Sequence, residues 1–166
     1  PVEVILDLIV ESKGETPVVN FNMQDNDVEA VMKHPAVMFG TDGYSLAPYG
    51  ILGRGKPHPR SYGTYPRVLK RYVRDRKLLT VEEAIRKMTS LPAQKLGLKN
   101  RGLIKEGMNA DIVVFNPATV EDKATFTNPH QYPDGMEYVI VNGTVVIEKG
   151  KHTGALPGRV LRKSRP

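Results

Sequence analysis

Residues 136–148, which read MEYVIVNGTVVIE, limit the fold of this chain more than any other stretch. Two runs of apolar and β-branched residues flank Asn142 and Gly143. Asn-Gly is favoured in two-residue hairpin turns, because both turn positions have positive φ. We therefore predict a β-hairpin. The stretch 101–117 is also rich in β-branched residues, so the chain from residue 98 to residue 166 is predicted to be a small β-unit.

The first 97 residues show a different pattern, in which helices alternate with short strands. Apolar residues at helical spacing predict helices over residues 1–14 and 25–35. Continuous apolar runs predict strands over residues 18–21 and 37–39. Such runs are typical of parallel strands that are covered on both faces, because half-exposed strands alternate apolar and polar residues. This part of the chain is therefore predicted to be an α/β unit.

A stretch rich in Gly, Pro, Tyr and basic residues, 47–66, precedes two further helices. We predict a loop of about twenty residues, and loops of that length in a compact domain are usually functional or disordered. The next helix is expected to begin at Pro66. Another is expected to begin at Thr80, because Thr80 and Glu83 have the spacing of a capping box. The residues predicted to face the core are Val68, Leu69, Tyr72 and Val73 in the first helix and Val81, Ala84, Ile85 and Met88 in the second.

The composition is that of a soluble globular protein, since 40% of the 166 residues are hydrophobic and 25% are charged. There is no cysteine, which excludes a disulfide framework, a Cys-based zinc site and a thiol nucleophile in this chain. No apolar run approaches the roughly 18 residues that a membrane span needs, and the first residues lack the plan of a signal peptide. We therefore expect a cytoplasmic protein that has no membrane partner.

The formal net charge of +6 raises the question of nucleic-acid binding. Many of the basic residues fall in two stretches, 67–77 and 158–166. No nucleic-acid-binding motif accompanies them. A solvated helix face and a basic terminal tail are the favoured interpretation, so we expect no nucleic-acid partner.

Five residues are candidates for a functional site. Asp42 directly follows the end of a predicted strand, but an Asp-Gly pair is also a common turn, and from the residues alone the turn is favoured. Arg60 lies in the predicted loop, where an arginine is usually a solvated charge. His58 lies between two prolines and has no second His at metal-ligand spacing, which favours a pocket wall over a metal ligand. Tyr62 and Thr64 are expected to share that wall.

The other three histidines are expected to be structural. His34 lies at the end of a predicted helix, where an imidazolium would suit the helix dipole. His130 and His152 fall in the predicted β-unit. Asp111, in the sequence NADIVVF, is predicted to open a strand and to fix a turn.

Four stretches occur in a fixed order along the chain: FGTDG, HPRSYGTYPRVLKRYVRDRKLLTVEEAIRKMTSLPAQKLGL, RGLIKEGMNADIVVFNP and MEYVIVNGTVVIEKGKHTG. Together they resemble the C-terminal part of the N-acyl-D-amino-acid deacylases (D-aminoacylases), a family of the metal-dependent amidohydrolase superfamily. The resemblance covers nearly the whole chain from about His34 onward. ADIVVF and VNGTVV are common in the wider superfamily, whereas the ordered set, with His-Pro-Arg before Tyr-Gly-Thr, is more specific.

The resemblance implies a (β/α)8 barrel that bears the metal site, together with a small β-sandwich domain. Residues 1–97 would be the C-terminal part of the barrel, in which 18–21 and 37–39 are its last two strands. Residues 98–166 would be part of the β-sandwich. A complete barrel takes about 250 residues, so this chain cannot close one alone. We therefore expect it to be the C-terminal portion of a longer enzyme, whose remaining barrel is an upstream segment or a partner chain.

The resemblance also implies the chemistry, which is hydrolysis of the amide bond of N-acyl D-amino acids by water activated on zinc or another divalent metal. The family's metal-binding His and Cys residues lie on earlier barrel strands, so we expect this chain alone to be inactive and to lack a full metal site. Asp42 corresponds to the family's proton shuttle, and a role as a metal ligand is a weaker option. Arg60 is the candidate anchor for the substrate carboxylate, with His58, Tyr62 and Thr64 as further substrate-binding residues.

Two alternatives stay open. The chain could be a non-catalytic fragment or subunit of a split amidohydrolase that assembles only with a partner chain or with a copy of itself. It could also belong to an amidohydrolase of different specificity, for a cyclic amide or a dipeptide. The preference for D-amino acids rests on the resemblance alone.

Overall fold

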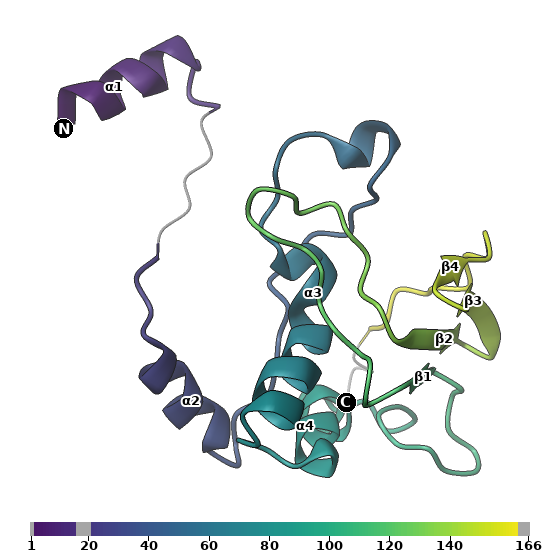
Figure 1. Ribbon diagram of the computed structural model, residues 1–166. Helices are drawn as coiled ribbons and strands as arrows, with labels where there is room; N and C mark the ends of the chain where they lie inside the picture. The colour runs from purple at the N-terminus through teal and green to yellow at the C-terminus, as the bar shows by residue number, and fades with distance from the viewer. Residues whose placement is uncertain (1, 16–20, 163–166) are drawn as a thin grey trace.

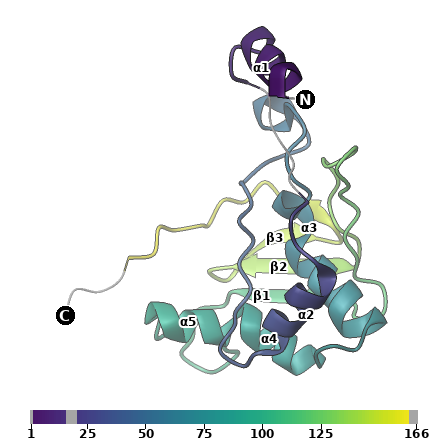
Figure 2. The same ribbon diagram turned by 90° about the vertical axis from the view of Figure 1, so that its left-hand side faces the viewer.

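The computed structural model describes residues 2–15 and 21–162. A layer of helices lies between helix α2 and a four-stranded sheet (Figure 1; Figure 2, turned by 90°). In chain order the elements are α1 (Val2–Glu11), α2 (Asp25–Lys33), the 3-10 helix η1 (Gly50–Gly53), α3 (Arg60–Arg67), the π-helix η2 (Val68–Asp75), α4 (Val81–Met88), α5 (Ser90–Leu96), β1 (Ile112–Phe115), β2 (Met136–Val141), β3 (Thr144–Glu148) and β4 (Lys151–His152).

The core lies between η2, α4 and the chain that follows β1. Val68, Leu69 and Tyr72 of η2 are between 4% and 6% exposed, and they pack with Ala84 of α4 and with Val120, both fully buried. The helical spacing of these apolar residues had predicted this core face, and the structure confirms it for the three η2 residues and Ala84. Partly buried side chains of α2 and of the sheet complete the cluster.

The helix starts are confirmed at Thr80 and wrong at Pro66. The Thr80 side chain accepts a hydrogen bond from the Glu83 backbone N–H at 3.2 Å, as an N-cap does. Helix α3, however, begins at Arg60 and contains Pro66, so the helix starts six residues earlier than expected. Its N-cap is Pro59, and the N–H of its first residue, Arg60, donates to the imidazole Nδ1 of His58 at 3.0 Å.

The predicted hairpin is confirmed. Strands β2 and β3 pair antiparallel, and Asn142 and Gly143 connect them with φ values of 48° and 81°. Positive φ at both positions is the type I′ geometry that Asn-Gly favours. Asp111 directly precedes β1 and accepts a hydrogen bond from the Asn142 N–H at 2.7 Å, so it fixes this turn as predicted. The sheet has the order β1-β2-β3-β4, with neighbouring strands antiparallel.

The predicted parallel strands are not confirmed. Residues 37–39 form no strand, and the strands within the described ranges all belong to the antiparallel sheet. The prediction over 18–21 falls mostly outside the described residues, and Phe21 is 76% exposed. A parallel strand takes its ladder of hydrogen bonds from a neighbouring strand, and no described strand lies beside 37–39. The Phe39 N–H donates instead to the Lys87 carbonyl, at 3.1 Å.

The basic stretch 67–77 is not a merely solvated face. Its side chains form ion pairs with carboxylates far away in the sequence, including those from Arg67 to Asp122 at 3.1 Å and from Lys70 to Glu121 at 2.8 Å. Further pairs join Arg71 to Asp25 and Arg76 to Glu29, in helix α2. These ion pairs connect η2 to α2 on one side and to the chain beyond β1 on the other.

Helix α1 presents its apolar residues to solvent. Val4, Ile5 and Ile9 are 60%, 57% and 47% exposed, and none of the ten residues of α1, all of them described, is buried. The apolar face predicted for this helix is therefore present but uncovered. Within residues 2–15 and 21–162, no helix is both long and apolar enough to cross a membrane.

Candidate functional site

The Asp42 loop is fastened to the first turn of α3. Asp42 has a φ of 47°, a left-handed conformation that is uncommon outside glycine, asparagine and aspartate. On its C-terminal side, the Tyr44 N–H donates to the Ser61 hydroxyl at 3.3 Å. Gly43 lies so close to α3 that a Cβ atom there would be 2.9 Å from the Ser61 Cα. Residues 41–47 form no helix, strand or turn, so the Asp-Gly pair is not the turn that the residues alone favoured. The loop instead carries the Asp42 carboxylate to the start of α3.

Arg60 and Asp42 meet at this point. Their side chains form an ion pair in which the Arg60 Nη2 is 3.0 Å from the Asp42 Oδ2. The Asp42 side chain is 84% exposed and that of Arg60 is 42% exposed, so both remain accessible to a ligand. The structure therefore brings together the two residues that the sequence predicted as proton shuttle and carboxylate anchor, although they are separated by a 3-10 helix and a long loop.

His58 faces the same cluster. The pKa of His58 is lowered below its ordinary value of 6.5. Burial is the largest cause and the nearby Arg60 guanidinium is the next, while the Asp42 carboxylate acts in the opposite direction. A neutral imidazole is also what the geometry needs, because its Nδ1 accepts the Arg60 N–H. His58 therefore binds the backbone of Arg60 at the first residue of α3.

Tyr62 and Thr64 lie on α3, and their hydroxyl groups are used within the protein. The Tyr62 hydroxyl is 2.9 Å from the Nδ1 of His130, and burial raises the pKa of Tyr62. The Thr64 hydroxyl donates to the Arg60 carbonyl at 2.9 Å. Thr64 lines the cavity described next, whereas Tyr62 turns to His130 and is not among the lining residues.

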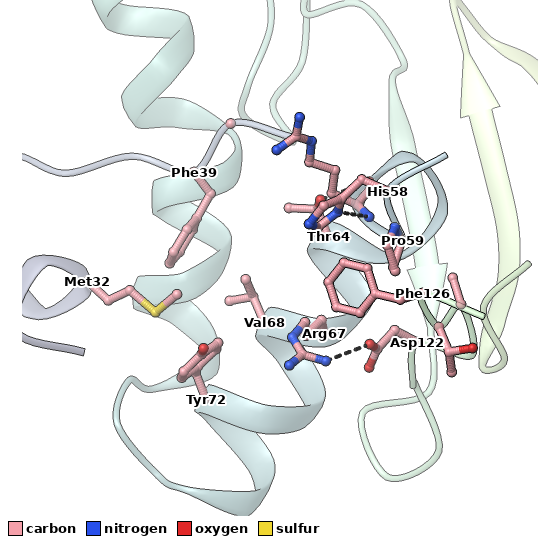
Figure 3. A pocket seen from close by; sticks show the side chains of 15 residues that line it. Met32, Phe39, His58, Pro59, Thr64, Arg67, Val68, Tyr72, Asp122 and Phe126 are labelled. Carbon is pink, nitrogen blue, oxygen red and sulfur yellow. Dashed lines mark hydrogen bonds and ion pairs between the residues drawn. The ribbon is translucent and has the colours of Figure 1, made fainter. Parts of the chain in front are cut away.

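A cavity of about 460 Å³ opens beside this cluster. Figure 3 shows Met32 and Phe39 on one side of it and Phe126 on the other. The ring of Phe126 stands edge-on to His58 at a centroid distance of 5.0 Å. Ligand pockets commonly measure about 300–1,000 Å³ and combine apolar walls with a few polar groups. This cavity is of that kind. Its lining residues are Met32, Phe39, Gly40, His58, Pro59, Arg60, Gly63, Thr64, Arg67, Val68, Tyr72, Asp122, Ala124, Thr125 and Phe126.

The described residues do not fit a metal centre. No group of three or more His, Cys, Asp and Glu side chains in the described part of the chain is arranged to hold a metal ion. Asp42 has a guanidinium as its neighbour, which is a cation and competes with a metal for the carboxylate. We therefore derive no chemical step through a metal on these residues.

Two contributors to the site were not predicted as such. His130 donates from Nε2 to the Gly55 carbonyl at 3.0 Å while its Nδ1 faces Tyr62, so it joins the loop before α3 to the helix itself. It does not lie in a strand, and a single His in a loop gives no periodic signal that could reveal this role. Phe126 likewise lies in the chain between β1 and β2, far from His58 in sequence. His34 is the C-cap of α2, and His152 lies in β4.

Comparisons with known proteins agree on one family. The model of the amidohydrolase family matches residues 2–147. The chain is 44% identical to N-acyl-D-aspartate deacylase of Alcaligenes xylosoxydans xylosoxydans over 85% of the chain and 27% of that relative. It is 42% identical to the N-acyl-D-glutamate deacylase of the same organism over 86% of the chain and 28% of that relative. A dihydroorotase of Lactobacillus acidophilus is 29% identical over 65% of the chain.

Solved structures give the same result. A crystal structure of D-aminoacylase superposes with a TM-score of 0.77 at 43% identity, covering 85% of this chain and 28% of that one. An N-acyl-D-glutamate deacylase from Bordetella bronchiseptica, complexed with zinc and a phosphonate inhibitor, superposes with a TM-score of 0.69 at 41% identity. The chain spans only 27% to 28% of the length of the curated deacylases named above. On these matches, the chain belongs to the amidohydrolase family.

Proposed function

We propose that this chain supplies Asp42 and Arg60 to the active site of an N-acyl-D-amino-acid deacylase, which hydrolyses the amide bond to a carboxylate and a free amino acid. The observation that carries the proposal is the ion pair between these two side chains, 3.0 Å apart and open to solvent. The names of the relatives support the substrate class, because N-acyl-D-aspartate and N-acyl-D-glutamate deacylases are 44% and 42% identical to the chain.

Asp42 is the proposed proton carrier. Its carboxylate takes a proton from the water that attacks the amide carbon, and it delivers the proton to the amine nitrogen when the C–N bond breaks. A general base must reach its proton within hydrogen-bond distance, which requires an accessible carboxylate. The 84% exposure of the Asp42 side chain and the attachment of its loop to Ser61 of α3 support this role.

Arg60 is the proposed anchor for the α-carboxylate of the substrate. A guanidinium can donate to both carboxylate oxygens at once, and this geometry orients the substrate as well as binding it. Arg60 already holds a carboxylate, that of Asp42, so the substrate carboxylate would take over donors that Asp42 now occupies. His58, Tyr62 and Thr64 are the further substrate-binding residues of this proposal. His58 and Thr64 also hydrogen-bond the backbone of Arg60.

The rest of the enzyme belongs to the same proposal. We infer that residues 1–97 complete a (β/α)8 barrel and that residues 98–166 form part of a small β-sandwich. The superposition on D-aminoacylase supports this architecture. Zinc, or another divalent metal, would supply the activation of the water when bound, as the zinc in the Bordetella deacylase structure suggests. The described residues contain no group of three or more possible ligands, so a full ligand set would need residues from elsewhere.

The alternative functions differ in the support that they have. The specificity for a cyclic amide is the weaker one, because the dihydroorotase match is 29% identical and the deacylase matches exceed 40%. A non-catalytic subunit that only assembles with a partner chain is favoured by one observation, the uncovered apolar residues of α1. That alternative predicts binding without turnover.

The test uses the protein encoded by the complete reading frame that contains this chain. Its initial rates are measured on N-acetyl D-aspartate, D-glutamate and D-leucine, on their L enantiomers and on dihydroorotate. We expect hydrolysis of an N-acetyl D-amino acid. Substitution Asp42→Asn should lower kcat by about 10²–10⁴-fold, the usual contribution of a general acid-base group.

The matched control is Asp27→Asn, because Asp27 is an exposed carboxylate in the first turn of α2. It should turn over at the wild-type rate. Undiminished turnover by Asp42→Asn would refute the role of Asp42. A wild-type protein that binds a partner chain but hydrolyses none of the substrates would support the non-catalytic alternative.

A further inference from the structure

Lys87 is the one charged or polar side chain that is fully buried among the described residues, with 0% exposure. It lies in the last turn of α4, on the face that packs into the core. An ammonium group is strongly hydrated, so burying it is costly unless hydrogen-bond acceptors replace the water. A fully buried Lys87 ammonium therefore needs acceptors from the protein.

These contacts lie in the short connection between α2 and the Asp42 loop. The Lys87 Nζ donates to the carbonyl of Val37 at 2.9 Å and to the carbonyl of His34. A Glu83 carboxylate oxygen is 3.8 Å from the same nitrogen. The neighbouring Arg86 donates to the carbonyl of Pro35 at 2.8 Å. Two adjacent cations of α4 thus hold three carbonyl groups of residues 34–37.

The backbone of α4 continues the same attachment. The Phe39 N–H donates to the carbonyl of Lys87 at 3.1 Å, so Lys87 binds this segment through both its side chain and its main chain. No described strand pairs with residues 37–39, so the hydrogen bonds to this segment come from α4, while the Phe39 side chain packs against the core. Asp42 follows three residues after Phe39. Beyond Asp42, the Tyr44 N–H donates to the Ser61 hydroxyl of α3.

We propose that Lys87 is a positioning residue for Asp42, which sets where the carboxylate stands by holding the chain that leads to it. The inference rests on the proposed function, because it presumes that Asp42 acts in hydrolysis. Proton transfer depends steeply on distance, and a misplacement of about 1 Å can cost about 10²-fold in rate. The carboxylate has one fixed side at α3, and Lys87 provides the other.

Substitution by Met tests the hydrogen bonds of Lys87 while it largely preserves the packing of the side chain. Lys87→Met keeps an unbranched apolar stem of similar size but leaves the His34 and Val37 carbonyls without their donor. Lys87→Arg keeps donors that can reach the same carbonyls. The control is Lys95→Met, because Lys95 is an exposed lysine in the last turn of α5.

The experiment measures kcat, KM and melting temperature of these variants in the complete protein, with the D-amino-acid substrate that the wild type hydrolyses. We expect Lys87→Met to lower kcat by about tenfold or more, with a KM within about twofold of wild type. The KM should change little because Arg60, the proposed substrate anchor, lies on α3 and not on α4. Lys87→Arg should retain more of kcat than Lys87→Met, and Lys95→Met should match the wild type.

Three results would overturn the inference. The first is an unchanged kcat in Lys87→Met. The second is an equal loss in Lys87→Arg and Lys87→Met. The third is that both variants are unfolded at the assay temperature, which would give Lys87 a role in folding alone. An inactive wild-type protein, in contrast, would reject the proposed function before the variants are compared.

Discussion

At the scale of residues, three side chains define the candidate site: Asp42, His58 and Arg60. The ion pair joins Asp42 to Arg60, and His58 accepts a hydrogen bond from the Arg60 backbone N–H. Their charges are therefore coupled. The neighbouring guanidinium disfavours a second positive charge on the imidazole, and the carboxylate favours it, which makes His58 a probe of both neighbours.

The pKa of His58 tests this geometry. We expect it to lie below 6.5 and to rise in Arg60→Gln, because the guanidinium that opposes the imidazolium is gone. In Asp42→Asn it should fall further. Folding stability that depends on a neutral His58 is present above pH 6.5 and is lost as the pH falls through the lower, folded-state pKa. The measurement is a two-dimensional NMR titration of the imidazole protons. If neither substitution changes the pKa of His58, then His58 does not interact electrostatically with Asp42 and Arg60 as the structure indicates.

At the scale of elements, a side-chain cap marks the start of α4. Thr80 caps α4 with its side chain, while the Glu83 carboxylate pairs with Arg86 and does not complete the capping box. The α4 helix carries Ala84 of the core and Lys87. Its start therefore matters for the packing of the helical layer and for the connection to the Asp42 loop.

Removal of this cap has a defined cost. Thr80→Ala should lower the free energy of unfolding by about 1 kcal/mol, because the Glu83 N–H loses its acceptor at the helix terminus. Urea denaturation measured by circular dichroism gives this value. Thr119→Ala is the control, since Thr119 is exposed and outside the helices and strands. If the two variants were equally stable, the Thr80 hydroxyl would contribute nothing to α4.

At the scale of the whole molecule, the helical layer and the sheet are joined by side chains of α3 and η2. Arg67 and Lys70 pair with Asp122 and Glu121, and Arg74 donates to the Val120 carbonyl at 2.8 Å. Helix α1 takes no part in this core and leaves its apolar residues exposed. Exposed apolar patches mark surfaces that associate with other chains.

We therefore expect the 166-residue chain on its own to self-associate. The double substitution Ile5→Glu with Ile9→Glu should reduce this association, because both residues are about half exposed apolar residues of α1. Sedimentation velocity over a range of concentrations gives the molecular mass. Asp7→Asn is the control on the same helix and should associate as the wild type does. A wild-type chain that stays monomeric at all concentrations would contradict the expectation.

The sequence by itself determined the features that depend on near neighbours. The hairpin at Asn142 and Gly143, the cap at Thr80 and the buried face of η2 could be predicted because a few adjacent residues fix each of them. That Asp42 and Arg60 belong to one site could be anticipated only through the family resemblance, because two residues this far apart in sequence leave no local pattern.

Only the tertiary structure decided the remaining features, and each of them depends on contacts between distant segments. Residues 37–39 have the composition of a strand but form none, because a strand needs a hydrogen-bonded neighbour and α4 takes that place. Helix α3 begins at Arg60, before Pro66, and the N–H of Arg60 donates to the His58 imidazole. The burial of Lys87 has no local sequence signal, because it depends on carbonyl groups of a distant segment that the fold brings to its ammonium group.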